Sequence, residues 1–471
     1  MGTSEENTIS KKSLFWDLID KIQGDKVILI IISMLILFSI VTIFSSTSLL
    51  AIANKTSRLD IFKEQMIIVI AGIAIITVCY ILSYIWLYRT ISQLGFIVSA
   101  ILLGLLHSPL GIRVNDAVRA VQLGPIPVHV YEVTKVAMVM YLAWATHAYK
   151  NGKFWIANEL SSKFKSLSFL SGKSWQLWIY IFIPIMAVSF GILVGSVSST
   201  LFIGGIMIIT ILIGGIRFKD IAKMLPLLAA GIMICVGIWF VSSGKMFKRV
   251  GTGFSRIGMT RLVERVTGHS VVSADAKRIS DIKPGTIEFQ EYLDKIRQPE
   301  SAKVAIHEGG LLGKGPGNSS QKYTVPLMFS DYMYSFIVEE YGLLGGIFVL
   351  SLFVSLLARG SIIVRSCDND YSKTVVAGLS ILISAQALMH MFINADIGPL
   401  TGQTLPMISH GKSSFICFSF AFGVLLSISK MAKAKIRKEE EASEPLAEGL
   451  GKPDDNVSNT LDELDRFESD I

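Results

Sequence analysis

The sequence predicts an all-α integral membrane protein with ten transmembrane helices, and its composition and patterning lead to that prediction. About half of the 471 residues are apolar (51%), only 17% are charged, and the mean hydropathy is +0.54. The apolar residues form unbroken runs close to the roughly 20 residues that a helix needs to cross a bilayer. Soluble domains carry about a quarter charged residues. This composition therefore excludes a soluble enzyme, a secreted disulfide scaffold and a disordered protein.

Ten apolar runs mark the expected spans. Two of them are weak on their own: 133–148 is short, and 200–216 follows its predecessor after only a Ser-rich turn, so a re-entrant hairpin is the alternative for this pair. The expected spans are residues 27–45, 66–84, 90–107, 133–148, 176–194, 200–216, 224–242, 333–358, 374–393 and 415–429.

The distribution of Lys and Arg among the short loops predicts the orientation. If the N-terminus lies inside, the inner segments hold most of these residues, as cytoplasmic loops do. Both termini are therefore expected in the cytoplasm. A polar segment of 26 residues precedes the first apolar run, and the run has no small-residue cleavage site. We therefore expect a retained anchor and not a removed signal peptide.

The spans divide the chain into three regions. Residues 1–26 form a cytoplasmic segment, residues 27–430 form the ten-helix membrane domain, and residues 431–471 form an acidic tail expected to be disordered. Within the membrane domain, a large loop at 243–332 separates spans seven and eight and is expected outside the cell. This loop is mildly basic, which favours an anionic ligand beside the membrane.

The composition also limits the partners and cofactors. The four cysteines show no CxxC or Cys/His spacing, so we expect neither a disulfide framework nor a cysteine metal site. The net charge of +7 is typical of a membrane protein with basic cytoplasmic loops, and it does not indicate nucleic acid as a partner.

The most specific stretch covers residues 309–346. Its glycines form a tight loop that can approach a ligand closely. Ser330 is expected to cap the following helix, which would place Asp331 in the first turn, where the helix dipole favours a carboxylate. Asp331 is therefore either a functional acid or only a helix-start residue. Glu339 and Glu340 lie in an apolar run, and a buried polar network between helices is the favoured interpretation.

Two further polar stretches lie at membrane depth, where ionisable groups suggest function. Residues 111–135 carry Arg119 on an outer loop, with Glu132 and Lys135 one helical turn apart, so that a satisfied ion pair is the simpler interpretation. Residues 399–414 are rich in Pro, Gly and Ser, which indicates irregular backbone facing protein or a watery cavity. His390 is expected to be a hydrogen bonder between helices. These features leave two classes open: an enzyme acting on a lipid-linked anion at the outer face, or a flippase or transporter of one.

Together the three stretches resemble the SEDS family (shape, elongation, division and sporulation) of FtsW, RodA and SpoVE proteins. The family patterns are similar to GGLLGKGPGNSSQ and PLMFSDYMYSFIVEEYGLLGG within 309–346, to GPIPVHVYEVTK at 124–135, and to PLTGQTLPMISHGKSS at 399–414. The segment FSSTS at 44–48 is also similar to the start of the family. Ten spans, cytoplasmic termini and the long loop between spans seven and eight are family properties as well.

The resemblance implies a peptidoglycan glycosyltransferase that polymerises lipid II, a disaccharide–peptide carried on undecaprenyl pyrophosphate. It implies that Asp331 is the catalytic base. It further implies substrate-binding roles for Arg119, Glu132, Lys135, Gly315, Ser319, Gln321, Ser409, Lys412 and Ser413. Glu339, Glu340 and His390 remain assigned to the polar network. A divalent cation, Mg²⁺ or Mn²⁺, is suggested for the family, and no metal ligands are assigned here.

The chain also departs from the family patterns in several places. The usual His-Thr before the aspartate is Phe329-Ser330, and the second Gly of the Ser-x-Gly-Gly motif is Lys412. These departures keep an inactive division scaffold open as an alternative, beside a lipid II flippase. The charged tail and the Gly-Pro-Gly-Asn-Ser loop favour the FtsW branch. The resemblance thus implies a septal role in the bacterial cytoplasmic membrane, with a class B (FtsI-like) penicillin-binding protein and other divisome membrane proteins as partners.

Overall fold

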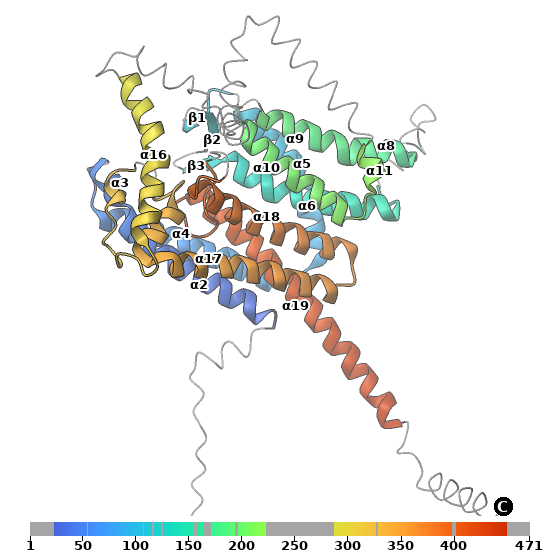
Figure 1. Cartoon of the computed structure of the whole chain (residues 1–471). Helices are drawn as coiled ribbons and strands as arrows, with labels where there is room; N and C mark the ends of the chain where they lie inside the picture. Colours follow the sequence, from blue (N-terminus) through green and yellow to red (C-terminus); the bar gives the residue numbers. More distant parts are fainter. Residues whose placement is uncertain are drawn as a thin grey trace, which may run out of the picture.

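Long helices packed side by side make up most of the computed structural model (Figure 1). The structure describes residues 23–222 and 287–449, apart from gaps at 54, 107, 115–116, 124–125, 155–158, 160, 162, 164–170, 194–195, 326–327 and 398–401. The N-terminal half contains α2 (Lys26–Ser46), α3 (Ser48–Ala53), α4 (Arg58–Ile81), α5 (Ile85–Leu106), α6 (Val130–Asn151), α8 (Lys173–Leu177), the π-helical turn η2 (Trp178–Phe182), α9 (Ile183–Leu193), α10 (Val197–Ile213) and α11 (Phe218–Ile221). The C-terminal half contains α16 (Ile287–Gly309), the 3₁₀ turn η4 (Gln321–Tyr323), α17 (Met333–Ser366), α18 (Asp370–Asn394) and α19 (Lys412–Gly449).

Seven of the described helical segments are long and apolar enough to cross a membrane, which makes this a multi-pass membrane protein. They are α2, α4, α5, the continuous stretch Lys173–Leu193, α17, α18 and the part of α19 up to Lys435. Two further predicted spans correspond to more polar or shorter helices, since 133–148 lies within α6 and 200–216 overlaps α10. The predicted span 224–242 lies outside the described residues.

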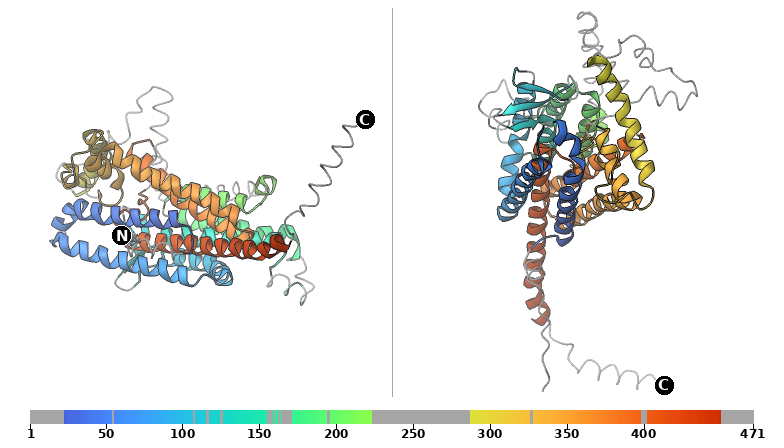
Figure 2. Two further views of the ribbon diagram at one scale, coloured as in Figure 1. Left: turned by 90° about the horizontal axis from the view of Figure 1, so that it is seen from below. Right: turned by 90° about the vertical axis from the view of Figure 1, so that its left-hand side faces the viewer.

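The C-terminal prediction needs a correction. We expected disorder from residue 431, but α19 continues without interruption to Gly449 and extends well beyond the bundle (Figure 2). Residues 431–442 are rich in Ala, Lys, Arg and Glu, which have high helix propensity, and they continue a helix that is already nucleated. The prediction of disorder is therefore wrong for 431–449, and residues 450–471 lie outside the described part.

The all-α prediction is wrong in one detail. Between α5 and α6 the chain forms a three-stranded antiparallel sheet in the order β1 (Gly111–Val114), β2 (Ala117–Leu123) and β3 (Ile126–His129). Ala120 pairs with Ile112 on one side and with His129 on the other. The local sequence carries the signals of such a sheet, because β-branched residues recur between the turn-forming pairs Asn-Asp and Gly-Pro.

Helix α6 lies at the centre of the bundle and is buried along most of its length. It packs against α5, α10, α18 and α19. Small residues permit this close approach: a Cβ added to Gly95 of α5 would lie 2.5 Å from the carbonyl oxygen of Ala137, and one added to Gly378 of α18 would lie 2.7 Å from Val139 Cγ1. The first turn of α6, with Glu132 and Lys135, is thereby held inside the protein.

Part of the predicted outer loop is helical. Of the residues 243–332, those from 243 to 286 lie outside the described part, and α16 follows them and stands against one side of the bundle (Figure 2). Ala302 and Ala305 of α16 are fully buried, and α16 packs against α17. Lys303 of the same helix pairs with Asp396, just beyond α18, at 2.9 Å.

Helix α17 is broken at Gly342, and the glycine loop after α16 fills the break. Gly342 has φ +71° and ψ −176°, which interrupts the helical hydrogen bonds. The carbonyl oxygens of Glu339 and Glu340 instead accept the N–H groups of Lys314 and Gly315, both at 2.9 Å. On the other side of the break, the N–H of Leu343 donates to Gly310 O at 2.9 Å. The loop thus satisfies backbone groups that a broken helix would otherwise leave without partners.

Substitution of Gly342 by alanine is expected to lower the free energy of unfolding by more than about 2 kcal/mol. An added Cβ would lie 2.2 Å from Leu311 O and 2.5 Å from Gly313 N, and the backbone already has a positive φ. The matched control is Gly317→Ala, which has φ +83° but no atom within 4 Å of the added Cβ, and should cost only about 1 kcal/mol. Thermal unfolding of the solubilised protein measures both, and equal losses would contradict the close fit of loop and helix.

Candidate active site

Asp331 lies in the turn that precedes α17, and its surroundings differ from the expected helix start. The helix begins at Met333, and its N-cap residue Tyr332 makes no side-chain cap. The predicted capping role of Ser330 is therefore wrong, and Asp331 is not in the first helical turn. Side chains of α18 accept hydrogen bonds from the first N–H groups of α17 instead. The backbone N–H of Tyr334 donates to His390 Nε2 at 3.3 Å, and that of Ser335 donates to Asn394 Oδ1 at 2.9 Å.

Several contacts hold Asp331 in place. Ser330 Oγ donates to its carboxylate Oδ1 at 2.7 Å, and Asn394 Nδ2 donates to its backbone carbonyl at 3.1 Å. The two preceding carbonyls are also used, because Ser409 Oγ donates to Ser330 O at 2.8 Å and the N–H of His410 donates to Phe329 O at 2.9 Å. Asn394 and the segment 409–410, both distant in the sequence, therefore hold the backbone that carries this carboxylate.

Arg119 of β2 approaches Asp331 across a glycine turn. A Cβ added to Gly402 (φ +61°) would lie 2.5 Å from Arg119 Nη1 and 3.4 Å from Asp331 Oδ2. Burial raises the pKa of Asp331, and the Ser330 hydroxyl and the Arg119 charge oppose that rise. His129 lies close enough to interact electrostatically with both. Burial lowers the pKa of His129, while Glu132 acts in the opposite direction.

Lys135 lies deeper in the protein and is fully buried. Its Nζ donates to Glu132 Oε1 at 2.8 Å, to Gln386 Oε1 at 2.5 Å and to Gln403 Oε1 at 2.9 Å. An ammonium group has three N–H donors, so these partners occupy all of them. In this arrangement Lys135 holds three walls of the site together, and a contact with substrate would require one of these bonds to be exchanged.

The segment 402–414 supplies further contacts between these walls. Ser413 Oγ accepts the N–H of His129 at 3.1 Å, and Ser414 Oγ donates to Glu132 Oε2 at 3.4 Å. Lys412 behaves differently from its neighbours: its side chain is exposed and pairs with Glu64 of α4 at 2.8 Å. The structure thus brings Arg119 next to Asp331 and Ser409 to the backbone that precedes it. Glu132, Lys135 and Ser413 are connected to them through His129, and Lys412 is exposed.

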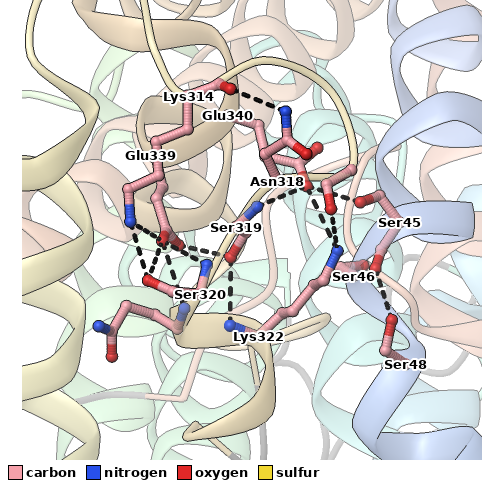
Figure 3. A network of polar contacts seen from close by, with 12 residues as sticks. Ser45, Ser46, Ser48, Lys314, Asn318, Ser319, Ser320, Lys322, Glu339 and Glu340 are labelled. Carbon is pink, nitrogen blue, oxygen red and sulfur yellow. Dashed lines mark hydrogen bonds and ion pairs between the residues drawn. The ribbon is translucent and has the colours of Figure 1, made fainter.

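Three other predicted substrate contacts lie elsewhere, in the clamp that the glycine loop forms on α17, where Figure 3 shows Ser319 beside Glu339. Gly315 bonds the carbonyl of Glu340, Ser319 Oγ donates to Glu339 Oε2 at 2.5 Å, and the N–H of Gln321 donates to Glu339 Oε1 at 3.2 Å. These groups are engaged with the two glutamates, so the structure brings them to the polar network and not to the carboxylate of Asp331.

The two buried glutamates in Figure 3 have different partners. Lys314 Nζ donates to Glu339 Oε1 at 3.1 Å, which supplies a cation to that carboxylate. Glu340 Oε1 accepts Ser45 Oγ of α2 at 2.6 Å and has Lys322 Nζ at 3.9 Å. Because buried charges require such partners, this network joins α2, the glycine loop and α17 into one unit.

Several residues of the site were not selected from the sequence. Gln386, Asn394 and Gln403 each bond a predicted residue, and all three are buried. Gln403 stands within the quoted stretch 399–414, so its position alone could have indicated it. Gln386 and Asn394 lie on α18, each one helical turn from His390 and two turns from each other, and the surrounding apolar run conceals this polar stripe.

The site offers acid–base and electrostatic chemistry. A carboxylate next to a guanidinium can remove a proton from a hydroxyl group while the cation stabilises a neighbouring anion. A divalent cation is less well provided for: among the described residues no group of three or more His, Cys, Asp or Glu side chains could hold a metal ion. Mg²⁺ usually keeps several waters and binds through one or two carboxylates plus substrate phosphates, so a cation that binds together with the substrate stays an expectation from the family resemblance.

The sequence matches a protein family described as "Cell cycle protein" (FTSW_RODA_SPOVE) over residues 25–434. A probable peptidoglycan glycosyltransferase FtsW from Trichlorobacter lovleyi is 26% identical over 407 residues, which cover 86% of this chain and 93% of the relative. Stage V sporulation protein E from Bacillus subtilis is also 26% identical, over 418 residues that cover 88% of this chain and 99% of the relative.

Solved structures show a similar fold. A chain from a peptidoglycan synthase complex aligns with a TM-score of 0.56 and 16% identity, covering 86% of this chain and 98% of that chain. The rod shape determining protein RodA of Thermus thermophilus aligns with a TM-score of 0.53 and 16% identity, covering 87% and 98% respectively.

Proposed function

Because the chain belongs to the FtsW/RodA/SpoVE family of cell cycle proteins, we propose that it is a peptidoglycan glycosyltransferase that polymerises lipid II at the outer face of the cytoplasmic membrane. The observation that carries the proposal is the half-buried carboxylate of Asp331 beside Arg119, on a backbone held by Asn394 and Ser409. Relatives that align with most of the chain are named probable peptidoglycan glycosyltransferase FtsW.

The proposed membrane arrangement has ten spans. To the seven apolar segments we add α6, α10 and residues 224–242, with both termini in the cytoplasm and residues 243–332 outside. This topology places Asp331 and Arg119 at the outer end of the bundle. A donor whose polyprenyl chain remains in the outer leaflet could then present its pyrophosphate and sugar to them.

In the proposed reaction, the Asp331 carboxylate removes the proton from the 4-hydroxyl of the acceptor GlcNAc. The oxygen then attacks C1 of the donor MurNAc, the configuration at C1 inverts, and undecaprenyl pyrophosphate leaves. Arg119 lies where its charge can stabilise the departing pyrophosphate. Lys135 and Glu132 keep the inner wall in place, and Ser409 and Ser413 fix the segment that faces it. No step is assigned to a metal ion.

The proposal extends to partners and place. A class B (FtsI-like) penicillin-binding protein that crosslinks the new strand would act beside this protein, together with other divisome membrane proteins, at the division septum. The first of these partners is supported by a chain of similar fold that was solved within a peptidoglycan synthase complex described as coordinating polymerization and crosslinking. The direct test is incubation of the purified chain and this partner with labelled lipid II: glycan ladders are expected, and movement of lipid II across sealed vesicles without ladders would instead support a flippase.

The dependence of the polymerisation rate on pH should report the ionisation of the Asp331 carboxyl group. Burial raises its pKa above the ordinary value of about 3.9, and the base is lost when the pH falls through the raised pKa. We therefore expect kcat to fall on the acid side with an apparent pKa above that of an ordinary aspartate. Arg119 lowers the pKa of Asp331, so Arg119→Gln should move this acid limb to higher pH.

Initial rates at saturating lipid II between about pH 4 and pH 8 measure this shift. Lys63→Gln is the control, because Lys63 pairs with Asp60 on α4 in an exposed position, and it should leave the limb unchanged. An acid limb that does not move when Arg119 is replaced would show that another group limits the rate.

A further inference from the structure

The outer end of α4 contacts residues 410–412. These residues are far from Asp331 in the sequence but bond the backbone next to it in the structure. Two consecutive α4 residues make the contacts: Glu64 Oε2 accepts Lys412 Nζ at 2.8 Å, and Gln65 Oε1 lies 3.1 Å from His410 Nδ1. Gln65 is fully buried, whereas Glu64 and Lys412 are exposed. We call these four residues, Glu64, Gln65, His410 and Lys412, the α4 clasp.

His410 connects the clasp to the chain that carries the proposed base. Its backbone N–H donates to Phe329 O at 2.9 Å, and its ring meets the Phe329 ring edge to face at 5.6 Å between centroids. The adjacent Ser409 Oγ donates to Ser330 O at 2.8 Å. Two successive carbonyls immediately before Asp331 are therefore fixed by two successive residues, one of which is held by α4.

The rest of α4 is a firm support for this grip. Gly72 packs so closely on α19 that an added Cβ would lie 2.5 Å from Ser419 Oγ and 2.6 Å from Phe415 Cε1. Gly423 of α19 packs equally closely on α4, with an added Cβ 2.8 Å from Cys79 Cβ. A helix that is packed in this way cannot slide, so the position of Gln65 is set by α19.

We propose that Gln65 and His410 are positioning residues for Asp331, and that the exposed pair of Glu64 and Lys412 supports them. The carboxamide oxygen of Gln65 accepts the Nδ1 proton of a neutral His410, the imidazole orients the 409–411 turn, and that turn fixes the backbone on which the base stands. This inference rests on the proposed function, in which Asp331 removes the acceptor proton.

The chemistry of His410 agrees with this geometry. Burial lowers the pKa of His410 to about 4; the Lys412 charge acts in the same direction and Glu64 opposes it. The imidazole is therefore neutral near pH 7, with one proton to donate. An amide oxygen accepts that proton without adding a charge beside Asp331. A displacement of the base by about 1 Å can cost as much as a hundredfold in rate, so a contact of this kind matters for turnover.

The first test replaces Gln65 by methionine, which has a similar volume but lacks the amide, in the full-length protein with its penicillin-binding partner. For lipid II polymerisation we expect kcat to fall about tenfold and KM to stay within about twofold. Gln65→Glu keeps an acceptor oxygen for His410 but adds a buried charge, so it should recover only part of the rate lost in Gln65→Met. The midpoint of thermal unfolding, measured for each variant, shows whether the fold is kept.

The second test uses the exposed pair, which does not depend on a buried side chain. Glu64→Lys and Lys412→Glu should each lower kcat, and the double variant, which restores an ion pair with the charges exchanged, should recover it. Asp60→Asn is the matched control, because Asp60 pairs with Lys63 at 3.4 Å within the outer end of α4, and it should not affect kcat.

The outcomes separate the two proposals. Unchanged kcat in Gln65→Met, or a charge exchange that fails to restore the rate, would overturn the positioning role. A rise in KM with kcat retained would also overturn it, since the clasp would then contact substrate. If Asp331→Ala itself keeps polymerising, the proposed function fails, whatever the clasp variants show.

Discussion

Replacement of Asp331 by alanine is expected to reduce lipid II polymerisation by about 10²- to 10⁴-fold, the usual contribution of a general base. The carboxylate is the proton acceptor in the proposed reaction, and the Ser330 hydroxyl beside it, at 2.7 Å from Oδ1, is not basic enough to replace it. Asp331→Asn should be equally inactive, because the amide keeps the shape of the side chain but cannot take the proton. The measurement is the length and amount of glycan from labelled lipid II.

The fold should survive both changes. The backbone of residues 329–331 is held by Asn394, Ser409 and His410 independently of the carboxylate, so thermal unfolding should stay close to that of the wild type. Asp370→Asn is the matched control: Asp370 begins α18 at the end opposite to Asn394 and pairs with Lys150 in an exposed position. It should polymerise normally.

Three outcomes distinguish the competing functions. An Asp331→Ala protein that still forms ladders rules out this base. One that still moves lipid II across sealed vesicles, with no ladders from the wild type, indicates a flippase. One that supports growth when the natural protein is depleted, while variants that cannot bind the partner do not, indicates a division scaffold that has lost its chemistry.

The hydrophobic runs predicted the helices well because burial in a bilayer demands long, uninterrupted apolar segments. The ends of the helices were less predictable. Ser330 looks like a helix cap, yet α17 begins at Met333 because His390 and Asn394 of another helix satisfy its first N–H groups. A cap supplied by a residue about 60 positions away leaves no local signal. The sheet at 111–129 does have a local signal, because β-branched residues recur there between turn-forming pairs.

The polar residues of the site could be selected from the sequence, but their partners could not. Ser319 and Gln321 share a motif with the glycine loop, which predicts contact with a ligand, whereas the structure engages them with Glu339. The break at Gly342 explains why: it brings the loop against α17, and the loop must satisfy the groups that the break exposes. Such compensation depends on three-dimensional packing and has no fixed spacing in the chain.

Replacement of Lys135 by methionine is expected to lower the free energy of unfolding by about 3–5 kcal/mol. Methionine fills a similar volume, but it leaves the Glu132 carboxylate without its cation and removes the donor shared by Gln386 and Gln403. Denaturation of the solubilised full-length protein measures the loss. Lys150→Met is the matched control on the same helix, because the ion pair of Lys150 with Asp370 is exposed and should contribute less than about 1 kcal/mol.

The double variant Lys135→Met/Glu132→Gln decides what the lost stability means. Without either charge, no unpaired carboxylate remains inside the protein, so the double variant should be more stable than Lys135→Met alone. The remaining deficit, about 1–3 kcal/mol, would come from the two glutamines that have lost a donor. If Lys135→Met is instead as stable as the wild type and only the KM for lipid II rises, then the ammonium exchanges one of its three partners for the substrate, and its role is to bind pyrophosphate or sugar and not to hold the walls of the site.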